Sequence, residues 1–438
     1  ISIDELGVPI KIAMNLTFPE VVNQYNRERM LKLVLNGPTT YPGAKYVRKH
    51  MEHYRTIRLK NIDTSTFELL NGDIVDRHLQ NGDYVLFNRQ PSLHKMSMMA
   101  HRVRVMPYDT FRLNVCVTPS YNADYDGDEM NMHVPQSLQT ENELINLAAV
   151  PTQIISPRDA KPIISIVQDI ALGVYRISKD HVSINQKQYF NIMCNNSKFC
   201  GEVQKPTKDM KWTGKQILSS ILPPNLNMQG GNRSYDPDKP GDYDVNYVKI
   251  ANGQIKQGVI DKGIYQGMTN GLIHMVYNEN GPKECTDLFD NTQKVICDWL
   301  VQDGFSVGIS DLIINKETTM NMKEITHEMK KKVYHEITKI HMGEMKNYTI
   351  KTNEEYFEDI VTNLLNDATK KIGKIGMDTI DDNNRMLNMI KSGSKGSTIN
   401  LIQMVGCLGQ QSVEGKRIGY GFDNRTLPHF TKYDDGPE

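Results

Sequence analysis

Closely spaced β-strand patterns in the first third of the chain constrain its fold most. In residues 102–106 the apolar Val103 and Val105 alternate with polar residues, and in residues 111–117 apolar side chains occupy every second position. Both patterns predict half-buried strands. The apolar run 84–87 follows a turn-forming Asn-Gly-Asp sequence and predicts a more deeply buried strand. Because these short strands follow one another so closely, we expect a compact barrel.

The composition is that of a globular protein. Of 438 residues, 39% are hydrophobic and 24% are charged, which excludes a disordered chain and suffices for two or three cores. The 51 Lys and Arg balance 52 Asp and Glu, so any nucleic-acid site must be local. No run of about 18 apolar residues occurs, and we expect no membrane partner. Because the chain opens at Ile1 without a signal-peptide pattern, we expect a piece of a longer protein.

The cysteines do not form a recognisable metal-binding pattern. The six cysteines include no C-x-x-C pair, so the spacing typical of structural zinc sites is missing. Without that pattern the simplest interpretation is a set of buried, reduced thiols. We therefore expect no structural zinc ion in this chain.

Two helices are predicted after the strand-rich segment. Thr140 and Glu143 form a capping-box pattern that predicts a helix start, and Pro151 predicts its end. Pro162 stands where a second helix would begin, and apolar residues recur at helical spacing from there to Ile177. This second helix should be largely buried.

A loop and a hairpin are predicted next. Residues 229–244 are rich in Gly, Asn, Asp and Pro, which predicts a long exposed loop. Asn252 and Gly253 lie between two alternating runs, and this dipeptide is typical of a type I′ β-hairpin turn. The middle of the chain should therefore mix strands and helices.

The last third is predicted to be helical. Residues 323–346 and 353–372 are amphipathic, and Thr352 with Glu355 forms a capping box for the second segment. A short polar break separates them, so we expect an antiparallel helical hairpin. The run of lysines at 330–332 is interpreted as a solvated helix face rather than a nucleic-acid site.

The chemistry concentrates in the segment Asn-Ala-Asp-Tyr-Asp-Gly-Asp-Glu that begins at Asn122. Asp124, Asp126 and Asp128 occupy alternate positions, and Gly127 permits the backbone bend that would bring their carboxylates together. Carboxylates without His or Cys among them suit Mg²⁺ or Ca²⁺ and suit zinc poorly. Three such charges repel one another when no cation is present, so we expect a metal site.

A calcium loop of the EF-hand type is the sharpest alternative. Asn122, Asp124, Asp126 and Gly127 fit its first positions, but the twelfth position requires Glu and carries His133. The preceding segment is also predicted to be a strand rather than a helix, and we reject the calcium loop. A polar turn with solvated acids is the simplest alternative. It is disfavoured because nothing would then offset the repulsion among three crowded negative charges. Such a site points to metal-dependent phosphoryl transfer, and the residue types alone lead no further.

Residues 122–136 closely resemble the active-site motif of the largest subunit of multisubunit DNA-dependent RNA polymerases. The sequence is most similar to the eukaryotic RNA polymerase II type, which includes enzymes of large DNA viruses. Further ordered blocks share this resemblance: residues 7–9, 13–22, 36–38, 42–46, 86–97, 304–308, 393–397, 409–417 and 434–438. Departures from the cellular pattern lie mainly in residues 315–382. This many blocks in one order exclude chance.

The resemblance implies a mixed α+β fold in three parts. A double-psi β-barrel active-site domain would cover residues 1–153, an α/β pore domain residues 154–314, and an α-helical funnel domain residues 315–438. In the family the bridge helix follows the last of these blocks. The strands and helices predicted above are compatible with this arrangement.

The resemblance also implies roles for single residues. Asp124, Asp126 and Asp128 would hold one tightly bound Mg²⁺, with a second Mg²⁺ arriving with the nucleoside triphosphate (NTP) and Mn²⁺ as a substitute. Arg89 and Asn122 match residues that touch ribose hydroxyls, and structural pairing is the less favoured alternative, for Arg89 in an ion pair. Lys395 matches a residue of the nucleotide entry pore, and a solvated loop lysine is the alternative. His94, Lys95 and His133 lie in matching blocks and receive no chemical role.

The implied function is Mg²⁺-dependent transfer of a nucleotidyl group from an NTP to the RNA 3′ end on a DNA template. Implied partners are the second-largest subunit, smaller subunits, DNA template, RNA transcript, NTPs and transcript-cleavage factors at the funnel. The location would be the nucleus for a cellular enzyme, or a cytoplasmic virus factory or virion for a viral one. The isolated fragment should be inactive, because the partner subunit supplies part of the active centre. The alternatives are a single-chain RNA-dependent RNA polymerase of gene silencing and a non-catalytic binding module.

Overall fold

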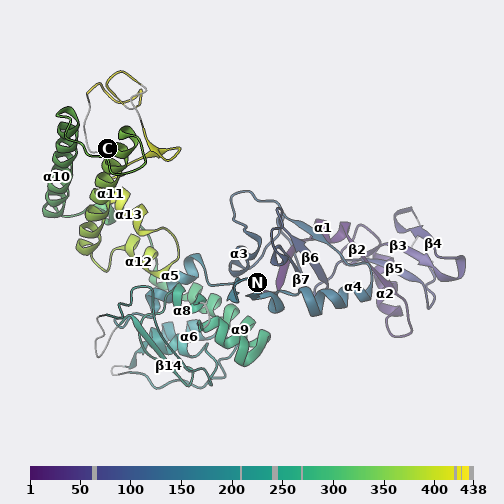
Figure 1. Cartoon of the computed structure of the whole chain (residues 1–438). Helices are drawn as coiled ribbons and strands as arrows, with labels where there is room; N and C mark the ends of the chain where they lie inside the picture. Colours follow the sequence, from purple (N-terminus) through teal and green to yellow (C-terminus); the bar gives the residue numbers. More distant parts are fainter. Residues whose placement is uncertain are drawn as a thin grey trace. The chain divides into compact units, whose positions relative to one another are not determined.

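The computed structural model describes residues 1–61, 67–207, 210–238, 245–267, 270–418, 422–425 and 427–433. The chain separates into two compact units, residues 1–302 and 303–438. The first unit is drawn in purple to green and the second in green to yellow (Figure 1). The first unit mixes helices with sheets, and the second is mainly helical. The chain is thus a mixed α/β protein.

The first sheet of unit 1 contains β1 (Glu5–Pro9), β7 (Met98–Met106), β6 (Tyr84–Asn88) and β8 (Asn131–His133), in that order. β1 is parallel to β7, whereas β7 and β8 run antiparallel to β6. The strands predicted at residues 84–87 and 102–106 are confirmed. Alternate side chains such as Val85, Phe87 and Val103 are buried in the main apolar core.

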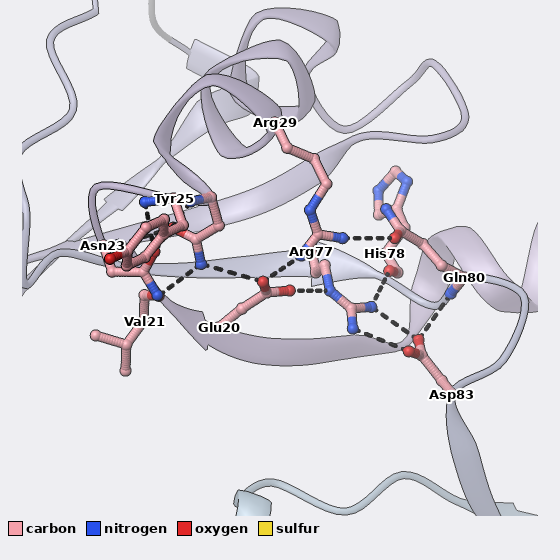
Figure 2. Close-up of polar contacts among 10 residues, drawn as sticks. Glu20, Val21, Asn23, Tyr25, Arg29, Arg77, His78, Gln80 and Asp83 are labelled. Atoms are coloured by element: carbon pink, nitrogen blue, oxygen red, sulfur yellow. Dashed lines mark hydrogen bonds and ion pairs between the residues drawn. The ribbon is translucent and has the colours of Figure 1, made fainter.

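A second sheet has its own core. It contains β2 (Thr17–Val21), β5 (Ile74–His78), β3 (Ala44–Lys49) and β4 (Arg55–Arg58), and α2 (Arg27–Asn36) packs on it. The buried Arg77 joins this sheet to the turn that leads into β6. Its guanidinium donates to Glu20 Oε2 at 2.7 Å and to both Asp83 oxygens at 2.7 and 2.9 Å, as Figure 2 shows. The ion pairs thereby set the start of β6, the strand that directly precedes Arg89.

The prediction of a strand over residues 111–117 is wrong. Only Arg112 forms an isolated bridge, to Gly7, and Val115–Val117 is a 3-10 turn. The Asn114 side chain accepts a hydrogen bond from the Cys116 N–H at 2.9 Å, which turns the chain out of an extended path. α3 (Thr118–Tyr121) follows directly, with Pro119 in its first turn. The alternating apolar residues still pack on the core, but from a turn.

Two predicted helix starts are also shifted. α4 (Leu138–Glu143) begins after Ser137, whose hydroxyl accepts from the Thr140 N–H, so Ser137 is the cap and Thr140 is not. Pro162 lies in β10 (Lys161–Pro162), which pairs with β9 (Ile155–Ser156), and this pairing delays the next helix. α5 (Gln168–Ile177) starts six residues later. Its burial is as predicted, since most of its residues from Ile170 onward are buried.

The rest of unit 1 completes the main core. Its helices are α6 (Gln186–Met193), α7 (Gly214–Ser219), α8 (Lys262–Gln266) and α9 (Leu272–Asp303), and its strands are β11 (Ser183–Ile184), β12 (Trp212–Thr213), β13 (Met228–Gly231), β14 (Tyr247–Ala251) and β15 (Gln254–Gln257). β14 and β15 form the predicted hairpin, with positive φ at Asn252 and Gly253. The loop predicted from residue 229 is partly wrong, because residues 229–231 belong to β13; residues 239–244 lie outside the described part.

Unit 2 contains the predicted helical hairpin. α10 (Lys316–His341) and α11 (Asn353–Thr379) lie side by side, and Thr352 with Glu355 forms the expected capping box (Figure 1). Lys331 and Lys332 are exposed on α10, as predicted for a solvated face. The unit ends with α12 (Arg385–Ser392), α13 (Thr398–Val405), β16 (Ser412–Val413) and β17 (Lys416–Arg417).

Two remaining expectations concern the whole chain. Among the described helices, none combines the length and the apolar character that a membrane crossing requires. All six cysteines are free thiols, but only Cys116 and Cys285 are buried. The expectation of uniformly buried thiols is therefore wrong, because three of the others lie at exposed positions.

Candidate metal centre

The carboxylate segment is a loop held at both ends and exposed between them. α3 ends at Tyr121, and Asn122 then adopts a left-handed conformation with φ 48° that turns the chain outward. The half-buried Ala123 and Met130 pack on the main core at either end of the tip. Between them residues 124–129 are exposed, apart from the half-buried Asp128. The core therefore fixes the ends of the loop while its acids face solvent.

A buried polar pair anchors the first end of the loop. Tyr121 is 2% exposed, and its hydroxyl lies 2.7 Å from His101 Nε2 on β7. Phe87 on β6 meets both rings edge to face. Burial lowers the pKa of His101 to about 4, so the imidazole is neutral at pH 7. The last residue before the loop is thus tied to the centre of the first sheet.

The three carboxylates converge. Asp124, Asp126 and Asp128 each offer an oxygen, and these oxygens lie within 4.8 Å of one another. Gly127 has φ 123°, a conformation that side-chain-bearing residues rarely adopt, so the bend expected there is present. Among the residues that the structure describes, these three aspartates are the His, Cys, Asp or Glu side chains that bring three potential ligand atoms this close together.

Arg89 contacts the cluster from the end of β6. Its Nη2 donates to Asp128 Oδ1 at 3.0 Å, and its Nε lies 2.8 Å from Asp128 Oδ2. The backbone N–H of Asp124 also donates to Asp128 Oδ2, at 3.1 Å. The ion pair predicted as the structural alternative for Arg89 is therefore present, and its partner is one of the candidate metal ligands.

The charges of the cluster alter the acidity of its members. The hydrogen bond from Arg89, followed by that from the Asp124 N–H, lowers the pKa of Asp128. A hydrogen bond with the Asp124 side chain, and then its negative charge, raises the pKa of Asp126. The crowding of carboxylates thus disfavours the charged form of Asp126, whereas the guanidinium of Arg89 favours that of Asp128.

The donor set fits a hard divalent cation. Every converging group is a carboxylate oxygen, and three oxygens so close together can turn toward one ion. Mg²⁺ commonly binds to few protein oxygens and keeps positions for water or phosphate. The exposure of the loop tip leaves room for such further ligands. Asp124, Asp126 and Asp128 therefore match the requirements of a magnesium site.

The structure places the other predicted residues as follows. Asn122 is exposed at the start of the loop, and Lys395 is exposed between α12 and α13 in the second unit. His133 lies on β8, paired with Leu86, at the position where a calcium loop would need its Glu ligand. The segment before the loop is a single helical turn, so the predicted strand that counted against a calcium loop is wrong. His133, which stands where that loop needs a Glu ligand, still excludes a calcium loop.

Sequence reasoning missed the residues that support the site. Asn88 is buried, and its amide donates to the Ser97 carbonyl at 2.9 Å and to the Ser92 hydroxyl at 2.6 Å. These bonds join the two ends of the loop that begins with Arg89, and they thereby hold the backbone of Arg89 in position. The available signal was a polar residue at the end of an apolar strand. His101 and Tyr121 carried no such signal.

Fold and site together define an α/β protein with an all-oxygen carboxylate cluster. Three family models match the chain in order: RNA polymerase Rpb1, domain 2, at residues 1–150, domain 3 at residues 153–312, and domain 4 at residues 337–438. The chain therefore belongs to the Rpb1 family, the largest subunits of DNA-directed RNA polymerase. This membership favours a DNA-directed enzyme over the single-chain RNA-dependent polymerase considered above.

Proposed function

We propose that this chain carries the metal site of a DNA-directed RNA polymerase, which transfers a nucleotidyl group from an NTP to the RNA 3′ end on a DNA template. The observation that carries the proposal is the convergence of Asp124, Asp126 and Asp128 within 4.8 Å in a chain of the Rpb1 family. The family implies assembly with other polymerase subunits and contact with DNA and RNA. The finer assignments of a double-psi barrel, a pore and a funnel belong to this proposal.

In this proposal the three aspartates hold one Mg²⁺, and a second Mg²⁺ arrives with the NTP. Bound Mg²⁺ would lower the pKa of the attacking hydroxyl and stabilise the charge of the phosphates. The loop anchored at Tyr121 positions the carboxylates, since its two ends are packed on the core while its tip is exposed. Mn²⁺ should replace Mg²⁺, because it binds the same oxygen ligands.

Other residues of this chain would select and deliver the nucleotide. Asn122 begins the carboxylate loop, and Arg89 contacts the loop through Asp128. The Asn122 amide and the Arg89 guanidinium can each donate hydrogen bonds to ribose hydroxyls. Lys395 would attract the triphosphate at the entry pore. The helical second unit would receive transcript-cleavage factors. The location would follow the source, the nucleus for a cellular polymerase or the virus factory or virion for a viral one.

Replacing Asp126 tests the proposal. In the polymerase assembled with its partner subunits, Asp126→Ala should abolish RNA synthesis and leave assembly intact, because an exposed ligand is lost and no core is emptied. Asp109→Ala is the matched control, since Asp109 is an exposed acid that pairs with the exposed Lys11. Substantial RNA synthesis by the Asp126 variant would remove this residue from the metal site.

A further inference from the structure

Arg89 contacts both oxygens of Asp128, the group through which this residue would bind a divalent cation. Its Nη2 is 3.0 Å from Oδ1 and its Nε is 2.8 Å from Oδ2, so both carboxylate oxygens contact the guanidinium. Oδ2 also accepts the Asp124 N–H at 3.1 Å. A carboxylate has about four lone pairs in all. Much of the capacity of Asp128 to bind a cation is therefore already taken by groups of this chain.

The reason for this arrangement is electrostatic. Three carboxylates with oxygens within 4.8 Å repel one another, and the guanidinium supplies a permanent positive charge beside them. A divalent cation would provide the same compensation more strongly. When both are present, the two positive charges repel each other and compete for the oxygens of Asp128.

We infer that Arg89 is an internal counter-ion that competes with the metal for Asp128 and makes the affinity of the three aspartates for the ion lower than it would be without the guanidinium. This inference rests on the proposed function, because it assumes that the three aspartates bind the ion. It assigns Arg89 a positioning role toward the metal in addition to any contact with the sugar. The Asp124 N–H would continue to orient Asp128 in a chain without the guanidinium. Removing the guanidinium should therefore strengthen metal binding rather than disorganise the site.

The test is a titration of the 438-residue chain with Mn²⁺, followed by electron paramagnetic resonance and by calorimetry. Arg89→Ala should bind Mn²⁺ about tenfold more tightly than the parent, as expected when a unit positive charge close to a divalent ion is removed in a solvent-like dielectric. Arg89→Gln, which keeps an N–H donor without the charge, should tighten binding as well. Arg104→Ala controls for net charge, since Arg104 is exposed on β7 and pairs with Glu5.

The outcomes separate the inference from the proposed function. Equal or weaker binding by both Arg89 variants, in a parent that does bind Mn²⁺ through the loop, would overturn the inference and leave the metal site in place. Binding by an Asp124→Asn, Asp128→Asn double variant that equals the parent would show that the loop does not hold the ion. That result would remove the basis of both. Circular dichroism of each variant verifies that the comparison is made between folded chains.

Discussion

The Tyr121 hydroxyl and His101 Nε2 lie 2.7 Å apart in the core of the first unit. Tyr121 precedes Asp124, the first aspartate of the loop, by three residues. The pair links the end of α3 to the middle of β7, and both side chains are almost completely buried. A buried hydrogen bond of this kind contributes modestly when formed, and its loss leaves a polar atom without a partner. The position of the carboxylate loop therefore depends on a polar contact inside an apolar core.

Removing the Tyr121 hydroxyl should destabilise the first unit. Tyr121→Phe leaves His101 Nε2 buried without this partner, and we expect a loss of about 1–3 kcal/mol in the free energy of unfolding. Tyr125→Phe is the control, because the Tyr125 side chain is exposed and its hydroxyl makes only a 3.4 Å contact with the Leu113 carbonyl. Urea unfolding of both variants measures the difference, and equal stability of the two would contradict the anchoring role.

Protonation of His101 should weaken the fold in mildly acidic solution. Burial lowers the pKa of His101 from 6.5 to about 4, so between these values the unfolded chain binds a proton that the folded chain does not. Stability should therefore be complete above pH 6.5 and decline as the pH falls toward 4, by about 3 kcal/mol for this group. The buried His78, whose pKa burial also lowers to about 4, should add to the same decline.

The contribution of His101 can be isolated by comparing stability at several pH values. His101→Gln should show a shallower decline between pH 6.5 and 4 than the parent, whereas His335→Gln, on the exposed face of α10, should not. Urea midpoints at each pH provide the measurement. A decline of unchanged steepness in the His101 variant would mean that this imidazole does not remain neutral in the folded chain.

Arg77 and Arg29 both bind Glu20 but should differ in their effect on stability. Arg77 lies between Glu20 and Asp83, as Figure 2 shows. The Arg77 side chain is buried, whereas half of the Arg29 side chain is exposed. Arg77→Met leaves two carboxylates without their shared cation, and we expect a loss of about 3–5 kcal/mol. Arg29→Met removes an exposed pair and should cost about 1 kcal/mol or less. Similar losses in denaturant unfolding would show that the Arg77 pairs are screened by solvent.

Arg89 should contribute to the choice between ribose and deoxyribose. In the assembled polymerase, Arg89→Ala should reduce the ratio of kcat/KM for an NTP to that for its 2′-deoxy analogue by about tenfold, since one hydrogen bond to the hydroxyl is lost. Arg104→Ala, which removes an exposed arginine of β7, should leave the ratio unchanged. If the Arg89 variant retains the parent's ratio, the side chain serves only in its ion pair with Asp128.

The local sequence determined those features that depend on a few neighbouring residues. The type I′ turn at Asn252 and Gly253 and the cap at Thr352 follow from backbone and side-chain preferences within four residues, and both are present. The alternate spacing of the aspartates about Gly127 likewise predicted a convergence that the backbone torsion permits. Membership of the Rpb1 family also follows from the sequence, because it rests on the order of many residues.

Tertiary structure decided what the acids contact. Arg89 and Asp128 are 39 residues apart, and they meet because β8 pairs with β6 and places Asn131 opposite Asn88. It also decided the conformation of residues 111–117, where an alternating pattern was overridden by the hydrogen bond from the Cys116 N–H to Asn114. Long-range pairing and burial override local propensity at such positions, and the residues next to a position in the sequence show local propensity alone.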